Sequence, residues 1–316
     1  MPALLALAAV TAVWGLTFVQ VKDAVALYPL FAFLAVRFAI AAVTLAPVAL
    51  APVRRLPRRG WEAGTLLGLL LAAGYALQTA GLERTTVSNA GFITGLYVVF
   101  TPLAAVALFR VRLARSVWAG VALATAGLAL LSGVGGADGI GDILVLLGAL
   151  AYSLQIALME RYAPRYDPLA FTFVEMLAAF AGFAVVAVAL GQVEIPRGWV
   201  VWGALLVTGV FASALGFFVQ TWAQRRTSAT RTALAFALEP VWAALFGYWL
   251  AGDRLGAIGW GGAALIMAGI AVAEPAAART LRRLVGSRGD EVRSATSRPA
   301  GRRRRPHGSR RPDAGP

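Results

Sequence analysis

The chain has 316 residues, of which 59% are hydrophobic and only 14% are charged, whereas charged residues make up about 25% of a typical soluble domain. This composition excludes an ordinary soluble protein and indicates a polytopic membrane protein. With no cysteine and one histidine, His307, the sequence also excludes disulfides, thiolate nucleophiles and zinc sites.

Ten apolar segments follow one another along the chain, each long enough to cross a hydrocarbon core of about 30 Å as a helix. Lipid offers no partner to unpaired backbone groups, so all ten are expected to be helical. The first is a retained helix and not a signal peptide, because it has no basic region before it and contains Trp14, Thr17 and Gln20. The predicted spans are residues 3–20, 30–51, 63–82, 88–109, 116–133, 142–159, 169–190, 200–221, 231–250 and 256–273.

Basic residues in the loops predict the orientation of these spans. With the N-terminus inside, eleven arginines fall in inner loops and four basic residues fall in outer loops. Cytoplasmic loops carry such an excess of Lys and Arg. We therefore predict a multi-pass protein of a bacterial inner membrane with both termini in the cytoplasm. The inner set is Arg54, Arg55, Arg58, Arg59, Arg110, Arg112, Arg115, Arg161, Arg165, Arg225 and Arg226, and the outer set is Lys22, Arg84, Arg197 and Arg254.

The chain contains an internal repeat. Gln78-Thr79 followed by Arg84-Thr85 recurs 142 positions later as Gln220-Thr221 followed by Arg226-Thr227, and Thr101-Pro102 recurs as Glu239-Pro240 at an offset of 138. Trp14 with Tyr152, Thr17 with Gln155 and Arg37 with Glu175 also match at 138.

The repeat divides the chain into two halves, residues 1–133 and 142–273, with five spans in each. Because five is odd, the second half must enter the membrane in the opposite sense to the first. The predicted fold is thus an all-α polytopic membrane protein with ten transmembrane helices in two inverted five-helix repeats, an architecture typical of secondary transporters.

Residues 274–316 have a different composition, rich in Arg, Gly, Pro and Ser. Twelve arginines and three acidic residues follow residue 278, so residues 279–316 supply nine of the fourteen excess positive charges. We expect a disordered cytoplasmic tail that lies on anionic lipid head groups. Binding of nucleic acid is not expected, although docking of a nucleic acid or protein on Arg302 to Arg305 is an alternative.

Three charged residues fall well inside predicted spans, away from the span ends: Arg37, Glu175 and Glu239. A charge near the bilayer centre costs at least about 2.5–3.5 kcal/mol, so each should face a cavity or a partner. Arg37 and Glu175 either bind other helices or extend toward the membrane faces. Glu239 either binds a substrate ammonium group or a proton in a ninth helix broken at Pro240, or holds a neighbouring helix by hydrogen bonds.

Uncharged polar and aromatic residues within the spans are the remaining candidates. Such side chains either join helices or line a substrate cavity. Tyr75 with Gln78, and Tyr152 with Gln155, are three residues apart and therefore share a helix face in each half. The candidate substrate-binding residues are Trp14, Tyr75, Gln78, Asn89, Tyr97, Tyr152, Gln155, Gln220 and Glu239.

Small residues at a spacing of four, as in Gly64-x-x-x-Gly68 and Gly91-x-x-x-Gly95, allow helices to approach closely. Packing within the chain is the favoured interpretation, and a homodimer is the alternative.

Several motifs resemble the EamA-like branch of the drug/metabolite transporter superfamily over residues 3–273. They are Trp14-Gly15-x-x-Phe18, Arg37-Phe38, Thr101-Pro102, Glu239-Pro240-Val241, Gly252-Asp253-Arg254-Leu255 and the glycine-rich last span. The resemblance implies two inverted five-helix repeats around a central cavity that moves small metabolites by alternating access, with efflux favoured. The chain departs from the family at Phe109-Arg110-Val111-Arg112-Leu113, where an acidic residue is usual.

We therefore predict a secondary transporter for an amino acid or another amphipathic solute. No cofactor or metal is expected, and the absence of a Gly-x-x-x-x-Gly-Lys-Ser/Thr loop argues against a built-in ATPase. Two alternatives belong to other classes. A membrane-embedded enzyme lacks a reactive set of residues, and a non-transporting sensor or accessory subunit would signal through the basic tail.

Overall fold

A computed structural model describes residues 2–85, 87–132, 139–246, 249 and 256–273, and no strand occurs among them. The long helices are α1 (Pro2–Val25), α2 (Leu30–Val53), α3 (Arg58–Leu82), α6 (Arg115–Ser132), α7 (Gly139–Tyr162), α8 (Pro168–Ala189) and α13 (Ala257–Ala273). The shorter ones are α4 (Val87–Gly95), α5 (Tyr97–Phe109), η1 (Ala163–Arg165), α9 (Trp199–Leu206), η2 (Val207–Leu215), α10 (Gly216–Gln224), α11 (Ala229–Phe236) and α12 (Glu239–Phe246).

Each of the ten predicted spans coincides with one of these helical segments. Six segments are long and apolar enough to cross a membrane by themselves, and three shorter apolar helices, Ile93–Phe109, Arg115–Leu130 and Ala257–Ala273, account for three more spans. The described part of the ninth span consists of the short helices α11 and α12. The described part of the chain therefore fits a polytopic membrane protein with ten helical spans. The predicted tail, residues 274–316, lies outside the described residues.

Three spans are not continuous α-helices. The fourth is divided at Leu96 into α4 and α5, and the ninth is divided at residues 237–238 into α11 and α12. The eighth runs through α9, the π-helix η2 and α10. Only the break in the ninth span has a signal in the sequence, because Pro240 cannot donate a backbone hydrogen bond.

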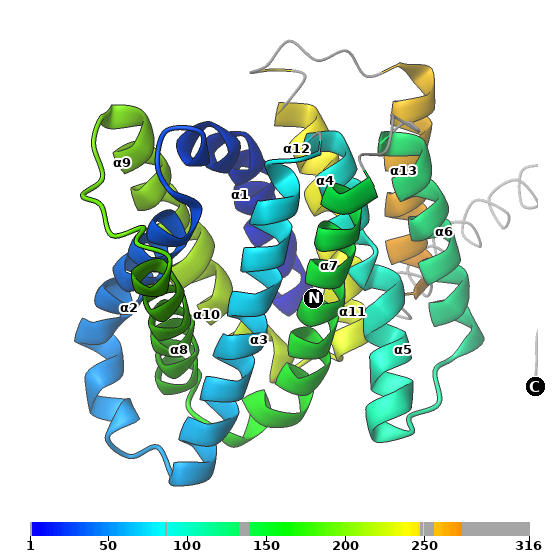
Figure 1. The fold of residues 1–316 in the computed structure, drawn as a ribbon. Coiled ribbons are helices and arrows are strands. Elements are labelled where there is room, and N and C mark those ends of the chain that lie inside the picture. The colour runs from blue at the N-terminus through cyan, green and yellow to red at the C-terminus, as the bar shows by residue number, and fades with distance from the viewer. Residues whose placement is uncertain (1, 86, 133–138, 247–248, 250–255, 274–316) are drawn as a thin grey trace, which may run out of the picture. The chain divides into compact units, whose positions relative to one another are not determined.

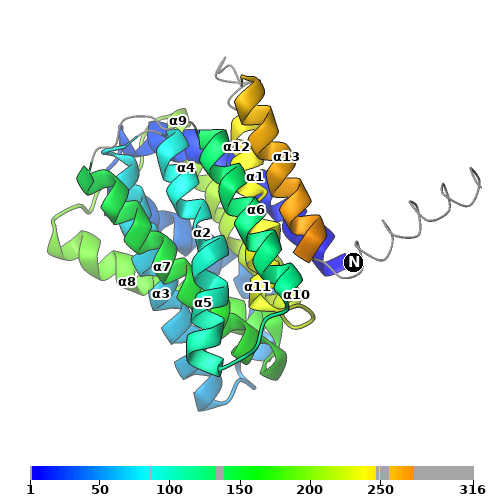
Figure 2. The same cartoon turned by 90° about the vertical axis from the view of Figure 1, so that its right-hand side faces the viewer.

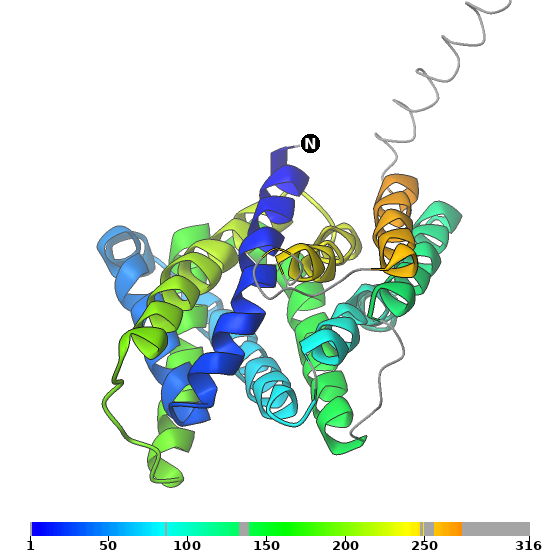
Figure 3. The ribbon, with the colours of Figure 1, turned by 90° about the horizontal axis from the view of Figure 1, so that it is seen from above.

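The helices pack in corresponding pairs from the two halves. α6 runs beside α13, and α2 packs against α8 (Figures 1 and 2). Toward the centre, α3 packs against α7, and the corresponding helices of the other halves, α10 and α1, also contact each other. In addition, α1 contacts α12 (Figure 3). These neighbours agree with two related halves, while the inverted orientation of the repeats stays a prediction.

Glycines allow these pairs to approach closely. A Cβ on Gly68 of α3 would lie 2.4 Å from the Glu175 carbonyl oxygen of α8, and one on Gly120 of α6 would lie 2.5 Å from the Gly269 carbonyl oxygen of α13. Only glycine fits at these contacts. Gly68, from the Gly64-x-x-x-Gly68 motif, therefore packs within the chain, as the sequence indicates.

Candidate functional site

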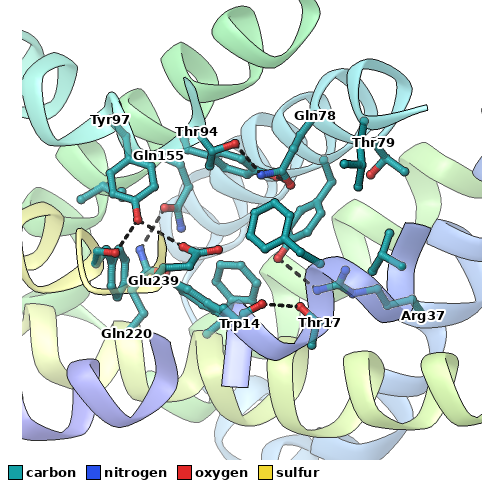
Figure 4. Close-up of a pocket in the computed structure, with 18 residues that line it drawn as sticks. Trp14, Thr17, Arg37, Gln78, Thr79, Thr94, Tyr97, Gln155, Gln220 and Glu239 are labelled. Carbon is teal, nitrogen blue, oxygen red and sulfur yellow. Dashed lines mark hydrogen bonds between the residues drawn. The ribbon is translucent and has the colours of Figure 1, made fainter. Parts of the chain in front are cut away.

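A central cavity is enclosed by helices from both halves of the chain and contains about 670 Å³ of empty space, part of it open to the outside. Its walls combine aromatic rings, polar side chains and two charged groups (Figure 4). The lining residues are Trp14, Thr17, Phe18 and Val21 of α1; Arg37 of α2; Tyr75, Gln78, Thr79 and Leu82 of α3; Thr94 of α4; Tyr97 of α5; Tyr152, Gln155 and Ile156 of α7; Phe217 and Gln220 of α10; Phe236 of α11; and Glu239 of α12.

Most of these residues occur in pairs related by the internal repeat. Twelve of the eighteen lining residues form six pairs that the repeat relates, with members 138 or 142 positions apart, the two offsets of the sequence repeat. The two halves therefore contribute corresponding positions to one cavity. The pairs are Trp14 with Tyr152, Thr17 with Gln155, Phe18 with Ile156, Tyr75 with Phe217, Gln78 with Gln220, and Thr94 with Phe236.

Glu239 occupies one end of the cavity, at the first residue of α12. Pro240 has no N–H to donate to the Phe236 carbonyl four residues earlier. The hydroxyl of Tyr97 donates to this carbonyl instead, at 2.7 Å, and lies 3.1 Å from Oε2 of Glu239. The break in the ninth span thus exposes a carboxylate to the cavity and is stabilised by a tyrosine of α5, from the other half of the chain.

Arg37 lies at the opposite end of the cavity (Figure 4). Its Nε donates to Oγ of Ser213 in the π-helix η2 at 2.9 Å, and Nη2 donates to the hydroxyl of Tyr75 at 3.1 Å. The guanidinium carbon is 4.4 Å from the centre of the Tyr75 ring. Within the described chain no carboxylate forms an ion pair with Arg37, whose side chain is only 2% exposed.

A row of aromatic rings connects these two ends. Tyr75 contacts Phe217 at 6.3 Å between ring centres, Phe217 contacts Trp14 at 5.5 Å, and Trp14 contacts Phe236 at 4.8 Å. Phe236 in turn is 6.2 Å from Tyr97. The Trp14 indole is held in place because Nε1 donates to the Ala212 carbonyl at 2.8 Å. The cavity therefore has an apolar, aromatic middle between two charged ends.

A chain of amide side chains connects the cavity to the buried Glu175. Gln155 donates to Oε1 of Glu175 at 2.6 Å, and Gln220 donates to Oε1 of Gln155 at 3.0 Å and to Gln224 at 2.9 Å. Glu175 itself does not line the cavity, is fully buried, and has no partner for Oε2 within the described residues. Neither Glu175 nor Arg37 extends to a membrane face; both bind residues of other helices.

The structure brings together eight of the nine substrate-binding candidates from the sequence, all except Asn89, whose side chain lies outside the described part of the chain. Their contact with a substrate stays a prediction. Sequence reasoning did not assign Thr94, Phe217 or Phe236 to the site. The repeat offset of 142 could have found Phe217 from Tyr75, and it also relates Thr94 to Phe236.

Comparisons with known proteins agree with one another. The model of the EamA-like transporter family matches residues 1–133 and 139–273. An uncharacterized transporter of Archaeoglobus fulgidus is 34% identical over 273 residues, which cover 85% of this chain and 84% of the relative. The uncharacterized inner membrane transporter YedA of Escherichia coli K12 is 27% identical over 81% of this chain and 85% of its own length. A solved crystal structure, 22% identical, shares the fold with a TM-score of 0.73 over 88% of this chain and 98% of that one.

Proposed function

Because the chain belongs to the EamA-like transporter family, we propose that it moves a small metabolite across the inner membrane by alternating access, with the central cavity as its binding site. The observation that carries this proposal is that both halves line the cavity with residues at corresponding repeat positions. Secondary transporters bind substrate between related halves that rock around a fixed site. The two moving units would be the repeats 1–133 and 142–273.

The uneven shape of the cavity supports this mechanism. Val21 and Leu82 line it, whereas Met159 and Gln224, their counterparts at offsets of 138 and 142, do not, although all four residues are buried. The lining thus reaches further toward the end of the spans that is predicted to face outward. The two ends of the cavity of an alternating-access carrier are expected to differ in this way.

The lining favours a substrate with both apolar and polar parts. Aromatic rings provide the apolar wall, and the Glu239 carboxylate provides a site for a cationic group. Glu239 and Glu175 are the buried acidic groups well inside the described spans, and they could couple transport to protons. We propose efflux as the direction, on the family resemblance of the sequence motifs.

Transport in proteoliposomes tests the proposal. The protein would be reconstituted with a panel of labelled metabolites, including amino acids and amphipathic cations, with and without an imposed proton gradient. The variant is Glu239→Gln. Its matched control is Glu62→Gln, which removes a surface carboxylate paired with Arg58 at 2.9 Å and should leave transport unchanged.

We expect saturable flux in the wild type and a strong loss of flux in Glu239→Gln. Loss of gradient-driven transport with facilitated movement retained would assign proton coupling to Glu239. Flux that is unaffected by Glu239→Gln would make the carboxylate structural. No saturable flux for any compound would contradict the transport proposal and favour the accessory-subunit alternative.

A further inference from the structure

The two charged groups of the cavity lie at opposite ends, and neither forms an ion pair with another described residue (Figure 4). We propose that the substrate carries an anionic and a cationic group separated by an apolar segment, with the anion bound by Arg37 and the cation bound by Glu239. This inference rests on the proposed function, and it specifies the chemical class of substrate that the same cavity takes.

Arg37 has the features of an anion site. An arginine has five N–H donors and stays charged at any physiological pH. The bonds to Ser213 and Tyr75 use two of these donors, so three remain for a ligand. A buried charge without a counter-ion is costly, and the planar guanidinium matches a carboxylate in a bidentate manner. The ligand is therefore the natural source of the missing negative charge.

Glu175, the other buried acid close to this region in the fold, does not supply that charge. Its Oε1 is bound to Gln155, and no ion pair joins it to Arg37 even though α2 and α8 pack against each other. At the other end, Glu239 has only the hydroxyl of Tyr97 as a side-chain partner among the described residues. Each charged end of the cavity thus lacks an opposite charge.

Aromatic rings lie between the two charged groups (Figure 4). The rings follow one another in space from Arg37 toward Glu239, with 4.8 to 6.3 Å between successive ring centres. Their order is Tyr75, Phe217, Trp14, Phe236 and Tyr97. An α-amino acid carries its amine and carboxylate on one carbon and cannot reach both ends. An ω-amino acid, or a molecule with similarly separated charges, spans them and places its apolar segment against the rings.

Calorimetric titration of the purified full-length protein in detergent tests this inference. The probes are ω-amino acids from 4-aminobutanoate to 8-aminooctanoate, each compared with its α-amino isomer, which has the same atoms but adjacent charges. The alkylamine and the carboxylate of the same chain length each lack one charge. We expect one ω-amino acid to bind about 10- to 100-fold more tightly than its α-isomer and than either single-charge compound, because a hydrogen bond to a charged group strengthens binding by about a factor of ten or more.

Two variants assign the charges. Arg37→Gln should abolish the preference for the ω-amino acid over the alkylamine, whereas Arg37→Lys should retain part of it. Glu239→Gln should abolish the preference over the carboxylate. The comparison of ligands on the wild-type protein does not depend on whether either variant folds.

Equal or tighter binding of the α-isomers, or a preference for a single-charge compound, would overturn the inference. So would binding of no ω-amino acid by a protein that transports another compound, a result that would leave the transport proposal intact. Conversely, charge-dependent binding of an ω-amino acid without any flux would support the inference and contradict transport.

Discussion

The substitution Tyr97→Phe tests how the break in the ninth span is stabilised. Pro240 leaves the Phe236 carbonyl without a helical donor, and the Tyr97 hydroxyl binds this carbonyl at 2.7 Å from another helix. Phenylalanine keeps the ring and its 6.2 Å contact with Phe236. The substitution removes the hydroxyl, so the Phe236 carbonyl loses its hydrogen-bond donor and the Glu239 carboxylate loses a polar contact.

The magnitude follows from two contributions. An interhelical hydrogen bond in a membrane protein is worth about 0.6 kcal/mol on average, and a buried acceptor left without a donor costs about 1–3 kcal/mol. We expect the free energy of unfolding to fall by about 1–2 kcal/mol, which corresponds to a melting temperature lower by about 2–6 °C. The matched control is Tyr152→Phe. The Tyr152 hydroxyl donates at 3.0 Å to the side chain of Gln78, which can turn toward another donor when the hydroxyl is removed. The cost of this control should not exceed about 0.6 kcal/mol.

Thermal unfolding of the purified variants in one detergent measures these differences. A Pro240→Ala background provides a second check, because residue 240 then has an N–H that can donate to the Phe236 carbonyl. In that background the cost of Tyr97→Phe should fall to half or less. Equal melting temperatures for Tyr97→Phe and Tyr152→Phe, or an unchanged cost in the Pro240→Ala background, would refute this explanation.

Two further predictions concern the packing and the amide chain. Gly68→Ala should lower the free energy of unfolding by about 1–3 kcal/mol, because the new Cβ would clash with the Glu175 carbonyl oxygen. The control Gly261→Ala has open space around it and should be neutral or stabilising. Equal melting temperatures for the two variants would contradict this. Gln155→Leu should cost about 1–3 kcal/mol because it removes the 2.6 Å hydrogen bond to the Glu175 carboxyl. That cost, measured by thermal unfolding, should decrease in a Glu175→Leu background, and an equal cost there would show that the bond is not its cause.

Hydropathy alone was sufficient to predict the ten helical segments, because each needs its own run of apolar residues to cross a membrane. The sequence also indicated the break at Pro240, since proline lacks a donor. It contained no such signal for the break at Leu96, which comes before Pro102, or for the π-helix Val207–Leu215. The π-helix contributes to a contact between helices that only the structure shows, the bond from Arg37 to Ser213.

The candidate site was predictable in part for a similar reason. Polar residues are rare among Ala, Leu and Val, so residues such as Gln78 and Glu239 were identified by composition. Apolar lining residues such as Phe217 and Phe236 could not be distinguished from core residues without knowing which face of each helix points inward. The separation of the two charges also required the three-dimensional arrangement, because Arg37 and Glu239 are far apart in the sequence.

Sided labelling of single cysteines most directly tests alternating access around this cavity. The chain has no cysteine of its own, so Val21→Cys and Met159→Cys each introduce a unique thiol at corresponding repeat positions. Val21 lines the cavity, and Met159 is fully buried. We predict that an impermeant thiol reagent applied from outside labels Val21→Cys but not Met159→Cys. An imposed substrate gradient should decrease the labelling of Val21→Cys from outside and should expose Met159→Cys to reagent applied from inside. Labelling of both positions from the same side, or labelling that substrate never changes, would contradict an alternating-access carrier.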